Sequence, residues 1–143
     1  MKKLSLIVLV VGVLFSCKEK TQKNEIEVEK LVNQIEVIDF HSTHRCMTCN
    51  AIEANTKYTL DTYFSSEVAA KKITFQAINV DEEMNLKIAE KFEATGTALF
   101  LNVIVDGKET QIDLTEFAFM SGNNQEEFSN ELKSKLEVEL AKI

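Results

Sequence analysis

The chain has 143 residues, of which 45% are hydrophobic and 27% are charged, and its formal net charge is −7. This length favours a single domain that can bury a core without a metal or a disulfide. The acidic balance argues against a nucleic-acid partner, because such a partner calls for a basic face.

The first sixteen residues have the layout of an export signal. Lys2 and Lys3 give a positive start, and a mainly apolar stretch follows over residues 4–15. This stretch is shorter than the roughly 20 apolar residues that a membrane-spanning helix needs. We therefore expect residues 1–16 to form a signal peptide that is removed from the mature protein.

Cys17 stands where the sequence becomes abruptly polar. Ser16, a small residue directly before the cysteine, makes this junction similar to the lipobox of bacterial lipoproteins. The resemblance implies a lipid on Cys17, membrane anchoring through acyl chains, and a place in the cell envelope on the periplasmic side or at the cell surface. The alternatives are an ordinary signal peptide and a buried N-terminal helix. Residues 17–30 are expected to form a flexible polar tether, and residues 31–143 the folded domain.

Strand and helix patterns alternate along the mature domain. Alternating or continuous apolar residues predict three strands, over residues 32–40, 73–80 and 98–105. Apolar residues at helical spacing predict one helix over residues 46–64, with a further turn at 68–70. A second helix is expected from Asp81, its candidate N-cap, to Phe92.

A hairpin and a final helix complete the pattern. Asp106-Gly107 predicts a type I′ turn, which needs positive φ at both positions. The return strand is expected to run from Ile112 to Met120, and the last helix has an apolar residue at every fourth position from Phe128 to Leu140. The predicted order is β-α-β-α-β-β-α, an α/β fold with a central mixed sheet and helices on both faces.

Cys46 and Cys49 lie where the first strand passes into the first helix. A Cys-x-x-Cys pair in this position is typical of a redox dithiol. A ring of four residues contributes only about 2 kcal/mol by the loop-entropy relation, so the pair would be a poor structural staple. Cys46, at the positive end of the helix dipole, is the candidate nucleophile, and Arg45 and His44 are expected to stabilise its thiolate. Cys49 is expected to be more buried and to act as the resolving thiol.

Two other uses of this loop remain open. His41, His44, Cys46 and Cys49 supply the ligand types of a zinc or copper site. Against this, structural zinc sites usually join two separated ligand pairs, whereas these four residues crowd one loop. A redox-inactive interaction domain is the second alternative, because a fold alone does not define a function.

Several features, in this order and spacing, make the chain from about Val32 to Ile143 resemble the thioredoxin-like family. They are residues 37–40 before the dithiol, the dithiol with Met47-Thr48 between its cysteines, residues 78–83, the turn at residues 106–108, and Gly122 before the last helix. The resemblance implies a thioredoxin-like fold, thiol–disulfide exchange with a protein partner through a mixed disulfide, and no cofactor.

Asp39 lies between the apolar residues Ile38 and Phe40, near the end of the predicted strand before the dithiol. In the family, a buried acidic residue near this position assists proton transfer to the resolving cysteine, so Asp39 is a candidate catalytic residue. The alternative is an exposed aspartate on an edge strand.

The chain also departs from the family pattern. The family usually has a tryptophan before the first cysteine and Gly-Pro between the two, where this chain has Arg45 and Met47-Thr48. Where the family has a cis-proline facing the dithiol, this chain has Thr97-Ala98, which the resemblance makes the substrate-facing residues. A cis peptide before a residue other than proline costs roughly 2.5–4 kcal/mol, so we expect this bond to be trans and the docking surface to be altered.

Overall fold

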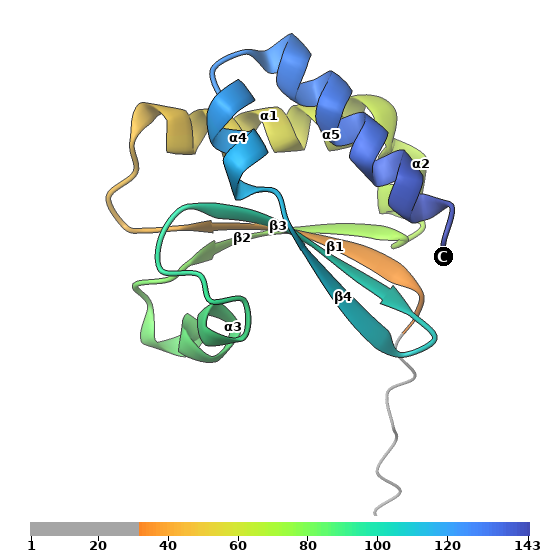
Figure 1. Cartoon of the computed structure of the whole chain (residues 1–143), viewed down its shortest axis with the longest axis horizontal. Helices are drawn as coiled ribbons and strands as arrows, with labels where there is room; N and C mark the ends of the chain where they lie inside the picture. The colour runs from red at the N-terminus through yellow and green to blue at the C-terminus, as the bar shows by residue number, and fades with distance from the viewer. Residues whose placement is uncertain (1–31) are drawn as a thin grey trace, which may run out of the picture.

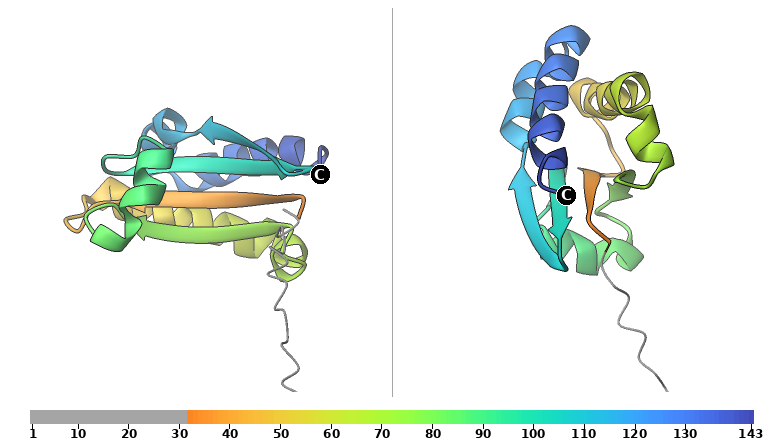
Figure 2. Two further views of the ribbon diagram at one scale, coloured as in Figure 1. Left: turned by 90° about the horizontal axis from the view of Figure 1, so that it is seen from below. Right: turned by 90° about the vertical axis from the view of Figure 1, so that its right-hand side faces the viewer.

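A four-stranded sheet organises residues 32–143, the part of the chain that this computed structural model describes (Figure 1). The strands are β1 (Gln34–His41), β2 (Ile73–Asn79), β3 (Ala98–Val105) and β4 (Lys108–Asp113). Their order in the sheet is β2-β1-β3-β4, so that β1 lies between β2 and β3 (Figure 2). β1 pairs in parallel with β2 and antiparallel with β3, which itself pairs antiparallel with β4. The predicted mixed α/β sheet is confirmed.

Helices cover both faces of this sheet. They are α1 (Met47–Tyr63), α2 (Ser65–Ala69), the 3₁₀ turn η1 (Glu83–Asn85), α3 (Leu86–Lys91), α4 (Thr115–Ser121) and α5 (Gln125–Leu140). α1, α4 and α5 lie on one face, and α3 lies on the other (Figures 1 and 2). The molecule therefore has the three layers that the sequence predicted.

Two apolar clusters hold these layers together, one on each face of the sheet. Side chains of a strand alternate between its faces, so β1 contributes Ile35 and Val37 to the cluster under α1 and α5, and Ile38 and Phe40 to the cluster over α3. In the second cluster, Phe40 and two further phenylalanine rings lie with centroids 5.3–6.0 Å apart. Because β1 is paired on both edges and buried on both faces, it holds the start of the loop that follows it in a defined position.

The prediction that the return strand runs on to Met120 is wrong. β4 ends at Asp113, and residues 115–121 form α4. The buried side chains of this segment are Leu114, Ala118 and Ser121, a spacing of four and three residues that is helical rather than alternating. Met120, which the strand prediction placed at the end of the return strand, is exposed.

Asp81 does not cap the helix that follows it. The N-cap of η1 is Glu82 and that of α3 is Asn85, and neither makes a side-chain capping hydrogen bond. The predicted hairpin turn is confirmed, since Asp106 has φ of 50° and Gly107 has φ of 79°.

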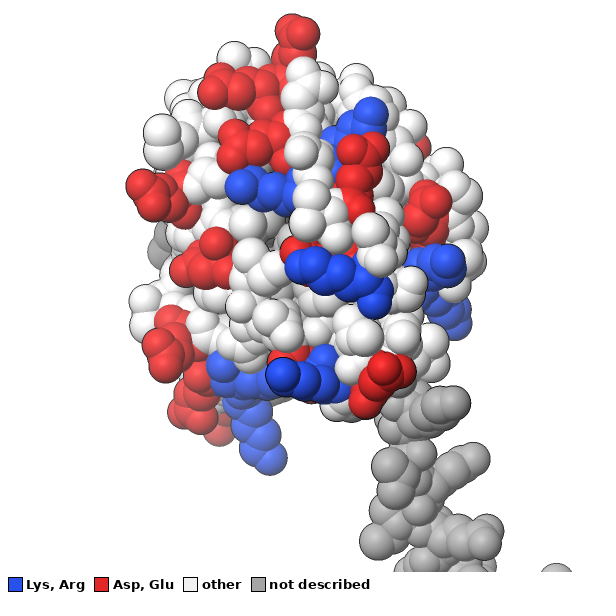
Figure 3. All heavy atoms as spheres, turned by 45° about the vertical axis from the view of Figure 1, so that its right-hand side comes forward, with Lys and Arg blue, Asp and Glu red and all other residues white. Residues whose placement is uncertain are grey.

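The surface carries mixed charge. On the face drawn in Figure 3, acidic side chains are interspersed with basic ones over the whole face. No helix within residues 32–143 is long and apolar enough to cross a membrane. The predicted signal peptide, Cys17 and the tether lie outside the described residues.

Candidate functional site

Cys46 and Cys49 form a disulfide at the start of α1. Cys46 is the N-cap of the helix, and its Sγ accepts a hydrogen bond from the Cys49 backbone N–H at 3.0 Å. Cys46 is exposed, whereas Cys49 is only 7% exposed. Cys46 is therefore the cysteine that a partner molecule can approach from solvent, whereas Cys49 is largely shielded.

The loop before Cys46 is fixed to the end of β2. The Thr43 backbone N–H donates to the Asp81 carboxylate at 2.7 Å, and the Asn79 amide donates to the Thr43 hydroxyl at 3.1 Å. The hydrogen bond from Thr43 lowers the pKa of Asp81, and the nearby His44 adds to this. Sequence reasoning assigned Asp81 to a helix cap and missed this role. The signal for it was that parallel strands end at the same edge of a sheet, which brings Asp81 beside the loop that follows β1.

The first turn of α1 packs against the corner between α4 and α5. Thr48 and Asn123 exchange hydrogen bonds at 3.1–3.3 Å, and the Asn55 amide donates to the Gly122 carbonyl at 2.9 Å. A Cβ on Gly122 would lie 2.6 Å from the Ala118 carbonyl oxygen and 3.0 Å from the Thr48 methyl group. Only glycine allows the corner to approach the dithiol helix this closely.

Asp39 lies fully buried in β1, on the face of the sheet that α1 covers. Its Oδ2 atom accepts a hydrogen bond from the Arg45 guanidinium at 3.1 Å, whereas its buried Oδ1 atom has no hydrogen-bond partner within residues 32–143. Burial raises the pKa of Asp39 to about 7, and the opposing effect of Arg45 is the smaller of the two. The alternative of an exposed aspartate on an edge strand is wrong. The carboxyl group can gain or lose a proton near neutral pH.

Arg45 extends beneath α1. Its Nη2 atom donates both to Asp39 and to the Cys49 carbonyl oxygen, at 3.1 and 3.0 Å, and its Nη1 atom donates to Glu53. The sequence suggested that Arg45 stabilises the Cys46 thiolate, but these hydrogen bonds go to the buried acid and to the helix.

The four candidate metal ligands do not form a site. The two sulfur atoms are bonded to each other, His44 is exposed, and Nδ1 of His41 lies 3.1 Å from the Ser42 carbonyl oxygen. Within the described part of the chain, no group of three or more His, Cys, Asp or Glu side chains is arranged to hold a metal ion.

Thr97 and Ala98 lie at the start of β3, where Ala98 is opposite Phe40 of β1. The described residues contain no cis peptide bond, so the expected trans bond between Thr97 and Ala98 is confirmed. A Cβ on Gly96 would lie 3.7 Å from Oγ of Ser42, which shows that the loops before β3 and before Cys46 are neighbours.

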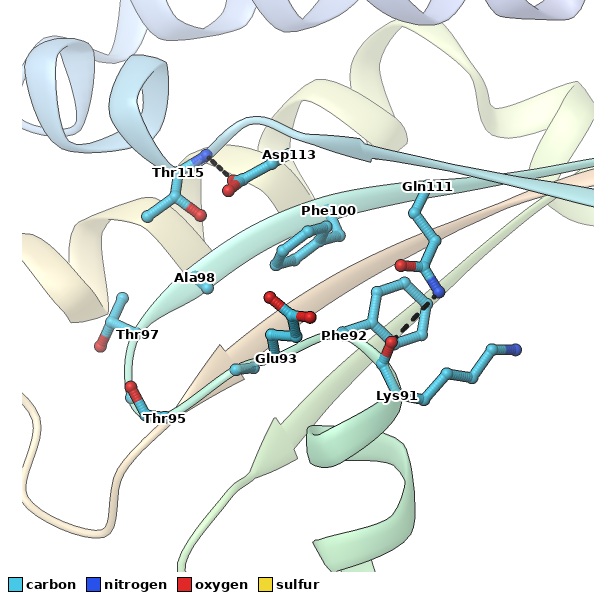
Figure 4. A pocket seen from close by; sticks show the side chains of 12 residues that line it. Lys91, Phe92, Glu93, Thr95, Thr97, Ala98, Phe100, Gln111, Asp113 and Thr115 are labelled. Atoms are coloured by element: carbon cyan, nitrogen blue, oxygen red, sulfur yellow. Dashed lines mark hydrogen bonds between the residues drawn. The ribbon is translucent and has the colours of Figure 1, made fainter.

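A cavity of about 610 Å³ opens beside Thr97 and Ala98 (Figure 4). Residues 91–98 form one wall, and residues from β3, β4 and the start of α4 form the other. This cavity could not be predicted from the sequence, because its walls come from segments that are separated along the chain.

Comparison with known proteins gives few matches. No model of a protein family matches the chain, and no curated protein matches it. Among solved structures, the chain is similar to one described as a malarial protein, with 16% identity over 62% of this chain and 96% of the other, and a TM-score of 0.40. It is also similar to Fasciola hepatica thioredoxin, with 22% identity over 62% of this chain and 77% of the other, and a TM-score of 0.41. The strand order β2-β1-β3-β4, the parallel pair β1–β2 and the cysteine pair at the start of α1 give this chain a thioredoxin-like fold.

Proposed function

We propose that this chain is a thiol–disulfide oxidoreductase that acts through Cys46 and Cys49. The observation that carries the proposal is the arrangement of the pair, with an exposed Cys46 at the N-cap of α1 and a buried Cys49 one turn later. A structural role explains the pair less well, because a ring this small contributes only about 2 kcal/mol to stability. No cofactor is needed for this chemistry.

Starting from the reduced protein, the exchange reaction has two steps. The Cys46 thiolate attacks one sulfur of a partner disulfide, forms a mixed disulfide with it and releases the other sulfur as a thiolate. Cys49 then gives its proton to the Asp39 carboxylate, and the resulting thiolate attacks Sγ of Cys46. The Cys46–Cys49 disulfide forms, and the partner leaves with both of its sulfurs reduced. Two electrons have passed from this chain to the partner, and the reverse steps oxidise a partner dithiol.

The geometry around Cys46 supports its role as nucleophile. A thiolate at the helix N-terminus faces the positive end of the dipole, and the Cys49 N–H already points at its sulfur from 3.0 Å. His44, exposed in the same loop, would add positive charge when protonated. Thr97 and Ala98 are proposed to face the partner chain, because their loop neighbours the one that precedes Cys46.

Trapping of mixed disulfides tests this proposal. The full chain with Cys49→Ser should accumulate disulfide-linked adducts with envelope proteins, because the serine cannot resolve the first step. The adducts should disappear on reduction and should be absent in the matched variant Cys46→Ser. If Cys49→Ser captures no partner and the wild-type protein reduces no small-molecule disulfide, the proposed function is wrong.

We further propose that the protein works in the cell envelope, held to a membrane by lipid on Cys17. The supporting features are the apolar signal at residues 4–15 and the small residue before Cys17. Its partners are then proteins of the same oxidising compartment, joined to it through mixed disulfides.

A further inference from the structure

The polar contacts beneath α1 form a connected group. One nitrogen of Arg45, Nη2, donates to both the Asp39 carboxylate and the Cys49 carbonyl oxygen. The other terminal nitrogen donates to Glu53, which also pairs with Lys57. Arg45 therefore joins the buried acid of β1 to the first and second turns of the helix that carries the dithiol.

Few charges act on Asp39. Its neighbours across the sheet, Ala77 in β2 and Leu99 in β3, are uncharged. Burial is the main cause of its raised pKa; the positive charge of Arg45 opposes this, Glu53 adds to it, and Lys57 opposes it to the smallest extent. Arg45 is the only one of these groups that hydrogen-bonds to the acid.

We propose that Arg45 is a positioning residue of the dithiol reaction, which acts through Asp39 by holding the ionised carboxylate beneath the first turn of α1. Glu53 weakens this stabilisation of the Asp39 carboxylate. It accepts a hydrogen bond from the same guanidinium, and its negative charge disfavours a second carboxylate at Asp39. The inference rests on the proposed function and adds to it a residue for which sequence reasoning suggested a different contact.

The consequence is clearest for the disulfide form. A partner thiolate attacks Sγ of Cys46, the bond between Cys46 and Cys49 breaks, and Cys49 leaves with the electron pair as a thiolate. The proton that Cys49 then takes comes from the Asp39 carboxylic acid, which becomes a carboxylate. Arg45 stabilises that carboxylate in place. Without Arg45, Asp39 would be a weaker acid, and its proton would be released only at higher pH.

The titration of Asp39 measures this effect directly. In the full chain, the carboxyl carbon of Asp39 can be followed by ¹³C NMR across pH, beside the pH profile of disulfide exchange. Arg45→Gln should move both inflections upward by about one pH unit or more, since a close opposite charge shifts a carboxyl by this amount. Arg45→Lys should restore part of the shift. Glu53→Gln should move the inflections downward, and Lys57→Gln should have a smaller effect than Arg45→Gln.

The background variant Asp39→Asn separates this inference from a general structural effect. It should remove the inflection, and adding Arg45→Gln to it should then leave the pH profile unchanged. If Arg45→Gln does not fold, Glu53→Gln provides the test instead. Its inflections should lie at lower pH than those of the wild-type protein, and unchanged inflections would overturn the inference. If Arg45→Gln exchanges disulfides and the pKa of its Asp39 equals that of the wild-type protein, this inference is wrong and the proposed function stands. A protein that titrates as described but exchanges no disulfide would overturn the proposed function as well.

Discussion

Asp39 has no exposed surface, and burial raises the pKa of its carboxyl to about 7 from 3.8. The folded protein therefore binds this proton more tightly than the unfolded chain does. The free energy of unfolding should decrease as the pH rises from about 4 to about 7, by about 4 kcal/mol in total, and should be insensitive to this group above that range. The buried Asp39 would thus lower the free energy of unfolding at neutral pH, where its carboxyl group can exchange protons.

The variant Asp39→Asn tests this dependence. It should be more stable than the wild-type protein at pH 8, and its stability should change less between pH 5 and pH 8, because the ionising group is gone. Urea unfolding at the two pH values measures both effects. Asp61→Asn, which changes an exposed aspartate on the same side of the sheet, is the matched control and should behave like the wild-type protein. An equal pH dependence in Asp39→Asn would contradict the prediction.

Chemistry at the level of single residues was only partly predictable. The cysteine pair and Asp39 could be identified from local sequence, because they lie where one predicted strand ends and one predicted helix begins. The partners of Arg45 and Asp81 do not follow from local sequence, because they depend on where the side chains point after the layers have packed.

At the scale of elements, the contact between α1 and the α4–α5 corner fixes the direction of the dithiol helix. Gly122 makes this contact possible, since a Cβ there would meet backbone and side-chain atoms at 2.6–3.1 Å. Gly107 lies in the hairpin turn, where nothing is within 4 Å of a Cβ; there it is the positive φ of 79° that favours glycine.

The two glycines provide a matched pair of variants. Gly122→Ala should lower the free energy of unfolding by about 1–3 kcal/mol, through overpacking, and should change the rate at which reduced Cys46 reacts with iodoacetamide. Gly107→Ala should lower stability by about 1 kcal/mol through backbone strain, and should leave that rate unaltered. Equal alkylation rates in all three folded proteins would show that the corner does not fix the dithiol helix.

Sequence patterns predicted some of these elements correctly and others not. The turn at Asp106-Gly107 was predictable because its backbone conformation depends on those two residues. α4 was not, because its short apolar stretch fits both periods, and the choice between them depends on packing against α1 and α5. The cavity beside Thr97 and Ala98 also arises only when distant segments meet.

At the scale of the whole molecule, the proposed lipid on Cys17 would determine where the protein works. Cys17→Ser should move the protein from the membrane fraction to the soluble fraction of the envelope, because no acyl chain would hold it. Labelling with a fatty-acid analogue should mark the wild-type protein and not the variant. Equal partition of the two proteins, with no label on either, would contradict lipidation.

The direction of β1 has a consequence for where the reactive sulfur faces. The strand starts at Gln34 and ends at His41, about 23 Å away at the usual rise per residue, and the dithiol loop follows this far end. If lipid upstream of Gln34 attaches the domain to a bilayer, the attachment enters the domain at the end of β1 opposite the dithiol loop. The attachment would therefore leave Cys46 uncovered and open to exchange partners.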